Sequence, residues 1–232
     1  MLYIGIPTID SNIHSKTFES IMKLKDNLLQ YDIKIKLDFE VGSLITRSRQ
    51  NILKRFYNTE DADYLLFIDA DISGFEHYIS NMILFTDTRP TSVIGLTYQK
   101  KNNKFTEEDY LSNNVYNLNL YYTIQATIKK SNNYYGFVKV KHLPTGCLLI
   151  PRQVITELLE INPKRRQFFN FFDPMVLSDG LNNQYLSEDY AFCERVNRIG
   201  SCIVNIQYQI HHHQNNNTYT GDYKEYLLGL LG

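Results

Sequence analysis

The hydrophobic positions of the first hundred residues alternate between two patterns. Short apolar runs are typical of strands buried in a sheet, and apolar residues three to four positions apart are typical of amphipathic helices. These patterns predict strands at Leu2–Ile6, Ile33–Phe39, Tyr64–Ile68 and Thr91–Tyr98, and helices at Thr17–Leu29, Thr46–Tyr57 and Glu76–Phe85. Strands and helices in alternation predict a mostly parallel sheet with helices on both faces.

The second half of the chain is less regular. The polar stretch Asn102 to Asn119 predicts a loop over the site. The other predicted elements are a strand pair at Tyr121–Ile128 and Tyr135–Lys141, a strand at Leu143–Ile150, a helix at Pro151–Ile161, an aromatic loop at Asn162–Leu186, a helix at Glu188–Ile199 and a strand at Cys202–Ile210. We therefore expect an α/β fold with a small antiparallel portion in its second half. Because no linker or repeat divides the chain, one domain is expected over residues 1–232.

Composition and charge restrict the classes of partner. Of the 232 residues, 43% are hydrophobic and 21% are charged, which is ordinary for a globular protein. The formal net charge of -1 provides no basic field for nucleic acid, and no apolar run approaches the length of a membrane span. The first ten residues lack the pattern of a signal peptide. Three cysteines without metal-ligand spacing indicate a reducing, cytoplasmic compartment.

The most informative feature is a pair of carboxylates directly after a buried strand. Asp69 and Asp71 follow the third predicted strand, and burying a bare carboxylate is costly. Ligands of open α/β sheets bind at the carboxyl ends of the strands, so this pair predicts a divalent cation held against phosphate. The structural alternative is a polar strand end in which Ser73 caps the next helix. A second Asp-Ala-Asp, at Asp61 and Asp63, precedes the strand and is interpreted as a solvated turn.

Three further groups of residues are candidates for chemistry. Glu188 and Asp189 open a helix, where acidic residues are favourable, but two adjacent carboxylates also suit general base catalysis. The three histidines at 211–213 follow a strand and predict at least one metal or phosphate ligand. Arg47 and Arg49 begin the second helix and are either a solvated face or partners of a diphosphate.

Taken in order, these segments resemble a glycosyltransferase of the Rossmann-like GT-A fold, of the family-2-like kind found in phages and large DNA viruses. The resemblance is carried by seven loose motifs, GIPT, TRSRQN, FIDADIS, VIGLTYQKK, LPTGCLLIPR, SEDYAFCERVNRIG and IHHHQNNNTYTG. They span nearly the whole chain in the family's order. The resemblance implies a nucleotide-diphosphate sugar donor, with a UDP-sugar as the first choice, and a Mn²⁺ or Mg²⁺ ion. It also implies a nucleotide-sugar-binding half at 1–100 and an acceptor-binding half at 101–232.

The resemblance also implies roles for individual residues. Asp69 contacts the donor ribose or the metal, Asp71 ligates the metal, and Asp189, beside Glu188, is the base that activates the acceptor hydroxyl. The residues expected to line the nucleotide pocket are Pro7, Thr8, Glu40 and Arg49. These expectations place the nucleotide site mainly in the first half of the chain and the acceptor base in the second.

The last metal ligand implied by the resemblance is a histidine, and His213 has the family's spacing to a later aromatic residue and glycine. Asn215 stands where the family has a nearer glycine. That departure leaves His211 and His212 open as alternatives.

The implied reaction moves a sugar to a hydroxyl of a glycan, glycoprotein or other acceptor, with inversion at the anomeric carbon. One base and one metal suffice, because a divalent ion neutralises the charge on the departing nucleoside diphosphate. A monomer or homodimer is expected, in the host cytoplasm if the chain is viral.

Three other classes remain alternatives. A haloacid-dehalogenase-like phosphatase also places Asp-x-Asp after a strand, but after the first strand rather than the third. A nucleotidyltransferase of similar fold would use the same carboxylates, but no glycine-rich basic loop follows the first strand. A non-catalytic carbohydrate-binding or particle-decoration protein would account for the 18 Tyr and 13 Phe without chemistry.

Overall fold

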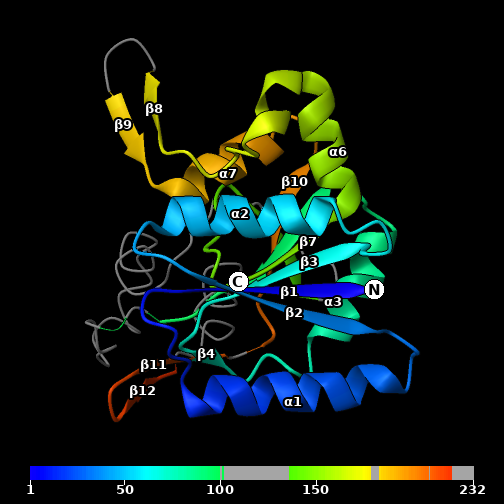
Figure 1. The fold of residues 1–232 in the computed structure, drawn as a ribbon, viewed down its shortest axis with the longest axis vertical. Coiled ribbons are helices and arrows are strands. Elements are labelled where there is room, and N and C mark those ends of the chain that lie inside the picture. The colour runs from blue at the N-terminus through cyan, green and yellow to red at the C-terminus, as the bar shows by residue number, and fades with distance from the viewer. Residues whose placement is uncertain (100, 102–135, 179–182, 209, 221–232) are drawn as a thin grey trace, which may run out of the picture.

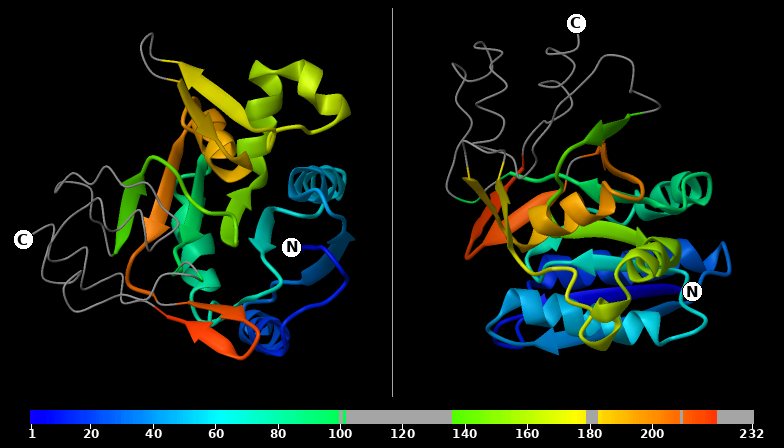
Figure 2. Two further views of the ribbon diagram at one scale, coloured as in Figure 1. Left: turned by 90° about the vertical axis from the view of Figure 1, so that its left-hand side faces the viewer. Right: turned by 90° about the horizontal axis from the view of Figure 1, so that it is seen from above.

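The computed structural model describes residues 1–99, 101, 136–178, 183–208 and 210–220. The first half contains β1 (Leu2–Thr8), α1 (Ser15–Leu29), β2 (Ile35–Val41), α2 (Ile45–Tyr57), β3 (Tyr64–Ile68), β4 (Ile72–Ser73), α3 (Ile79–Asp87) and β5 (Ser92–Leu96). The second half contains β6 (Phe137–Val140), β7 (Cys147–Pro151), α6 (Arg152–Ile161), the 3₁₀ helix η2 (Pro163–Gln167), β8 (Met175–Ser178), β9 (Asn183–Leu186), α7 (Glu188–Val196), β10 (Ser201–Asn205), β11 (His211–Gln214) and β12 (Asn217–Tyr219). Figures 1 and 2 show helices on both sides of a central sheet.

In the described part of the chain, the central sheet has seven strands in the order β2-β1-β3-β7-β5-β10-β6. β1 is parallel to both β2 and β3, and β10 is parallel to β5. β7 is antiparallel to its neighbours β3 and β5, and β6 is antiparallel to β10. The predicted fold class, a mostly parallel sheet with a small antiparallel portion, is confirmed.

Each face of this sheet is covered by its own hydrophobic core. On one face, Leu65 and Phe67 of β3 pack in a cluster with residues of α2, α6 and α7. On the other face, Leu66 and Ile68 pack with residues of α1 and α3. The apolar run of β3 is continuous because successive side chains enter opposite cores. Burial on both faces leaves the end of β3 as the first place where a polar side chain can reach solvent.

Several predicted boundaries differ from the structure. The predicted aromatic loop contains η2 and a hairpin formed by β8 and β9, whose largely exposed residues give no hydrophobic alternation. Tyr135–Lys141 was expected in a strand pair with Tyr121–Ile128, but its described part, β6, pairs with β10. Tyr121–Ile128 and the predicted loop Asn102–Asn119 lie outside the described residues.

The strand predicted at Cys202–Ile210 is shorter in the structure. β10 ends at Asn205, whose side-chain oxygen accepts a hydrogen bond from Gln207 N at 2.9 Å and turns the chain out of the central sheet. The three histidines then begin a separate strand, β11, in a small sheet of order β12-β11-β4. In this sheet His211 lies opposite Ser73 and His212 opposite Ile72.

The small sheet therefore brings the histidines directly beside the segment that follows Asp71. The turn between β11 and β12 places Asn215 at a φ of 54°. Asparagine tolerates this left-handed conformation better than most residues, which explains how it can stand in the glycine's place. No helix in the described ranges is long and apolar enough to cross a membrane.

Candidate functional site

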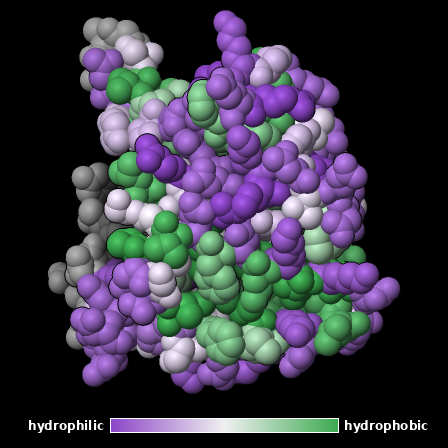
Figure 3. Space-filling view, in the orientation of Figure 1, coloured by the Kyte–Doolittle hydropathy of each residue, from purple (hydrophilic) through white to green (hydrophobic). Residues whose placement is uncertain are grey.

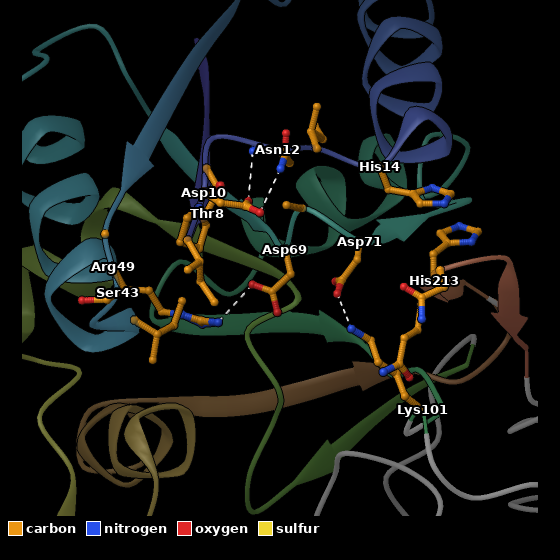
Figure 4. A pocket seen from close by; sticks show the side chains of 18 residues that line it. Thr8, Asp10, Asn12, His14, Ser43, Arg49, Asp69, Asp71, Lys101 and His213 are labelled. Carbon is orange, nitrogen blue, oxygen red and sulfur yellow. Dashed lines mark hydrogen bonds and ion pairs between the residues drawn. The ribbon is translucent and has the colours of Figure 1, made fainter.

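A cavity of about 790 Å³ opens at the carboxyl ends of β1 and β3. Figure 4 shows its lining side chains converging from the loop after β1, the start of α2, the loop after β3 and β11. The lining residues are Pro7, Thr8, Ile9, Asp10, Asn12, Ile13, His14, Gly42, Ser43, Ile45, Arg49, Asp69, Ala70, Asp71, Lys101, His213, Gln214 and Asn215. The position at the carboxyl edge of the parallel strands is where α/β sheets bind ligands.

Backbone hydrogen bonds hold the loop that carries both aspartates. Asp69 N donates to the Gly146 carbonyl at 3.0 Å, and the Asp69 carbonyl accepts from Ile72 N at 3.1 Å. A Cβ at position 146 would lie 2.2 Å from the Tyr98 hydroxyl, so glycine is required for this close approach. The tight turn from Asp69 to Ile72 presents Asp69 and Asp71 to the cavity (Figure 4).

Arg49 is the buried cation of the site. Its side chain is 4% exposed, and its Nη2 donates to Asp69 Oδ1 at 3.0 Å. Its Nε and Nη1 are buried and make no hydrogen bond in the described structure. Arg49 borders the cavity, and these two nitrogens are donors beyond the one that Asp69 uses, so the guanidinium is a candidate partner for a phosphate or carboxylate group.

The surroundings of Asp69 disfavour its charged form. Desolvation raises the pKa of its carboxyl group, and the nearby charge of Asp71 adds to that rise, while the Arg49 guanidinium opposes it. Asp189 contributes a further rise, so the start of α7 lies within electrostatic reach of Asp69. An additional positive charge in the cavity would therefore favour the charged form of Asp69.

Asp71 already has cationic and polar partners. Lys101 Nζ forms an ion pair with Asp71 Oδ2, and His212 Nε2 lies 3.7 Å from the same oxygen. Burial raises the pKa of Asp71, but the nearby His212 and Lys101 outweigh it and lower the pKa to about 2. His212 Nδ1 lies 2.9 Å from the Gln99 carbonyl, which can only accept, so Nδ1 carries the proton and Nε2 can present a lone pair.

His213 lines the cavity but has both ring nitrogens engaged. Nε2 is 2.7 Å from Ser73 Oγ, and Nδ1 is 3.0 Å from Thr218 Oγ1. The ring stacks on His14 with centroids 4.2 Å apart, as Figure 4 shows. Desolvation, together with the neighbouring histidines His14 and His211, lowers the pKa of His213 to about 4. Ser73 binds this ring and does not cap α3, which begins at Ile79.

Glu188 and Asp189 begin α7 as predicted. Asp189 Oδ1 accepts from Tyr190 N at 2.8 Å and from the Ser187 hydroxyl. Desolvation raises the pKa of Glu188, while Arg49 lowers it and Asp189 raises it further. The charges of Glu188, Asp189 and Arg49 therefore influence one another, although the two carboxylates lie outside the cavity lining.

The structure does not bring every predicted residue to the cavity. Glu40 bonds Arg55 Nη1 and Asn51 Nδ2, each at 2.7 Å, and neither Glu40 nor Arg47 lines the cavity. Asp61 and Asp63 are exposed before β3, as expected of a solvated turn.

Among the site residues that were not singled out from the sequence, Lys101 and His14 contact other side chains of the site. Lys101 lies in the motif VIGLTYQKK just beyond β5, whose carboxyl end shares an edge of the sheet with β1 and β3. A lysine after a strand is a weak signal by itself. His14 precedes α1, where its Nδ1 accepts from Lys16 N at 3.3 Å, and nothing in its sequence context indicates a partner 199 positions later.

In the described ranges, no three His, Cys, Asp or Glu side chains form a preassembled metal site. The donor types nevertheless suit Mn²⁺ or Mg²⁺, because carboxylates lie beside an imidazole whose Nε2 can be unprotonated. The ammonium group of Lys101 on Asp71 further shows that a cation is accommodated at this carboxylate. Asp71 and His212 are the residues that fit such an ion, with Asp69 nearby.

Comparisons with known proteins support the fold. No family model matches the chain, and no curated protein does so. A structure of A197 from STIV matches with a TM-score of 0.54 at 14% identity, over 94% of this chain and 93% of that chain. A structure of GalNAc-T7 with UDP, GalNAc and Mn²⁺ matches with a TM-score of 0.53 at 10% identity, over 91% of this chain and 43% of that chain. The chain has a GT-A-like fold, and at these identities the likeness extends to the fold alone.

His213 should make stability depend on pH in the absence of metal. Its pKa is about 4 in the folded chain and 6.5 in its ordinary state, so between these values the unfolded chain binds more protons. Stability should therefore fall as the pH falls through this window and level off below it. We expect His213→Gln to lose that part of the pH dependence in urea denaturation with a chelator present. Identical pH profiles for the variant and the wild type would contradict this assignment.

Proposed function

We propose that the protein is a glycosyltransferase that uses a nucleotide-diphosphate sugar, with a UDP-sugar as the first candidate donor. The observation that carries this proposal is the buried Arg49, with two unpartnered nitrogens, beside Asp69 and Asp71 in one cavity. The cavity joins a site for negative charge to a site for a cation. A diphosphate bound through a divalent ion requires that combination.

The donor would occupy the cavity between the loop after β1 and the aspartates. Pro7 and Thr8 line one wall, and the Arg49 guanidinium would supply positive charge to the phosphate oxygens. When bound, Mn²⁺ or Mg²⁺ supplies a positive charge that stabilises the leaving nucleoside diphosphate. We propose Asp71 and His212 as its protein ligands, with Asp69 on the ion or the donor ribose. His213 remains the ligand implied by the family spacing.

Asp189 is proposed as the base for the acceptor. Its Oδ1 accepts two hydrogen bonds, one from Ser187 and one from Tyr190 N, which orient the carboxylate and leave Oδ2 for an acceptor hydroxyl. The acceptor oxygen would attack the anomeric carbon as its proton passes to Asp189 and the bond to the diphosphate breaks. Direct displacement of this kind inverts the anomeric configuration. Glu188 is proposed to position the acceptor.

Asp71→Ala should abolish metal-dependent binding of UDP. Loss of a ligand should cost more than the roughly 10- to 100-fold in metal affinity that loss of a supporting residue costs. The matched control is Asp63→Ala, the second aspartate of the other Asp-Ala-Asp, which is exposed at the opposite end of β3. Calorimetric titration of UDP with and without Mn²⁺ measures both variants. Equal losses in the two variants would overturn the proposed nucleotide site.

His212 and His213 should differ in their contribution to the affinity for Mn²⁺. His212→Ala should weaken Mn²⁺ binding by about tenfold or more, because Nε2 of His212 is free to coordinate beside Asp71. His213→Ala should have a smaller effect, because its nitrogens are engaged by Ser73 and Thr218. Titration of Mn²⁺ followed by electron paramagnetic resonance distinguishes them. A loss confined to His213→Ala would instead support the family spacing.

Asp189→Asn should reduce turnover and leave donor binding almost unchanged. Asparagine keeps an acceptor for Tyr190 N but cannot take the proton, so kcat for transfer should fall by about 10² to 10⁴. The rate is measured with a nucleotide-sugar donor and an acceptor found by screening, and donor affinity is measured by calorimetry. Retention of anomeric configuration in the product, read by NMR, would exclude Asp189 as the base of an inverting reaction, and so would near-normal turnover.

A further inference from the structure

β2 forms one edge of the central sheet, with β1 as its neighbour among the described strands. Leu2 N donates to the Lys34 carbonyl at 2.8 Å, and Gly42 N donates to the Thr8 carbonyl at 2.9 Å. Residues that bond to one neighbour alternate along a strand, so the even-numbered residues of β2 face β1. The odd-numbered residues from Ile35 to Val41 therefore direct their N–H and C=O groups outward. An open edge of this length is a template for another strand.

The sequence along this edge is complementary to itself. Residues 33–41 read IKIKLDFEV, with an apolar residue at every odd position. The even positions carry two positive charges followed by two negative charges. When a second copy is turned end over end about Leu37, Lys36 comes opposite Asp38 and Lys34 comes opposite Glu40. Every charged position then meets the opposite sign, and every apolar position meets an apolar residue.

An exposed apolar surface accompanies the open edge. Figure 3 shows hydrophobic side chains gathered over the band between α2 and α1, where β2 runs. The exposed apolar residues of the two elements are Leu37, Phe39 and Val41 on β2 and Phe18, Met22 and Leu29 on α1, each between 40% and 62% exposed. Contiguous apolar surface of this kind marks a site of association.

We propose that β2 pairs with β2 of a second copy of this chain, in antiparallel orientation centred on Leu37, to form a homodimer with one continuous sheet. In this register Leu37 lies opposite Leu37, and Ile35 lies opposite Phe39. These are the residues whose backbone groups point outward, so each such pair exchanges two hydrogen bonds. Pairing then removes from water the apolar side chains of the two β2 edges and the exposed apolar residues of α1 in each copy.

The charges favour a second copy over an unrelated strand. Lysines on an edge strand normally prevent pairing. Lys34 and Lys36 make no ion pair with a described residue; Lys36 Nζ instead lies near Thr59 and over the Tyr3 ring. Asp38 and Glu40 are held in place by Arg55. In the antiparallel register, Asp38 and Glu40 of the second copy lie opposite Lys36 and Lys34 of the first. Opposite charges then face each other, and the repulsion between lysines that would prevent pairing is removed.

Cysteine cross-linking tests both the partner and the register. Residues that directly face each other in a hydrogen-bonded pair have Cα atoms about 5.5 Å apart, within the range of a disulfide. Leu37→Cys should therefore form a covalent dimer on mild oxidation, seen on a non-reducing gel. The matched control is Phe39→Cys, because two copies of position 39 would be offset by four residues, about 13 Å along the strand. The native cysteines are buried free thiols and should not contribute.

Sedimentation of the uncross-linked protein provides the second measurement. Wild-type protein should sediment as a dimer at micromolar concentration. Lys36→Glu, at an exposed position, should raise the dimer dissociation constant about tenfold, since each dimer then contains two repelling pairs. Circular dichroism checks that the variant is folded. A monomeric wild type, or cross-linking at position 39 equal to or greater than that at position 37, would overturn the proposal.

Discussion

The pairing of Arg49 with Asp69 is the interaction on which the rest of the candidate site depends. A guanidinium with 4% of its side chain exposed cannot rely on water, and Asp69 is its one carboxylate partner in the described structure. Removing either residue would leave an uncompensated buried charge, which is more costly than losing an exposed ion pair. Because the pair joins α2 to the end of β3, it also fixes the direction in which the two aspartates leave the sheet.

The loop after β3 is then completed by segments far away in sequence. Gly146 accepts from Asp69 N, and His213 N donates to the Asp71 carbonyl at 2.9 Å. Tyr98 occupies the space beside Gly146. Charge on Asp71 is met by Lys101 and His212, so the two aspartates lie between two cations, Arg49 and Lys101. This arrangement gives each aspartate a cationic partner and leaves Nε and Nη1 of Arg49 without a hydrogen bond in the described structure.

Much of this arrangement could be predicted from the sequence, but only where a signal is local. Asp69 and Asp71 follow a continuous apolar run, and that contrast identifies the end of a doubly covered strand. The division between β10 and β11 depends on one side-chain hydrogen bond of Asn205, which hydropathy does not reveal. Glu40 was expected at the nucleotide pocket, but it is engaged by Arg55 from the neighbouring helix. Lys101 and His14 contact residues far away in the sequence, Asp71 and His213 respectively. Such long-range contacts leave no pattern in the local sequence of either partner.

The central position of β7 has a consequence for how the chain reaches this structure. β7 is made after β3 and β5, yet it fills the gap between them, and Leu149 lies opposite both Leu66 and Ile94. During synthesis, the edges of β3 and β5 that will pair with β7 therefore remain unpaired until β7 has been made. At about 5–20 residues per second, the interval between the end of β3 and the completion of β7 is on the order of ten seconds. Contacts of such long range slow folding, so the nascent chain has a period in which it is prone to aggregate and in which a chaperone would have the greatest effect on yield.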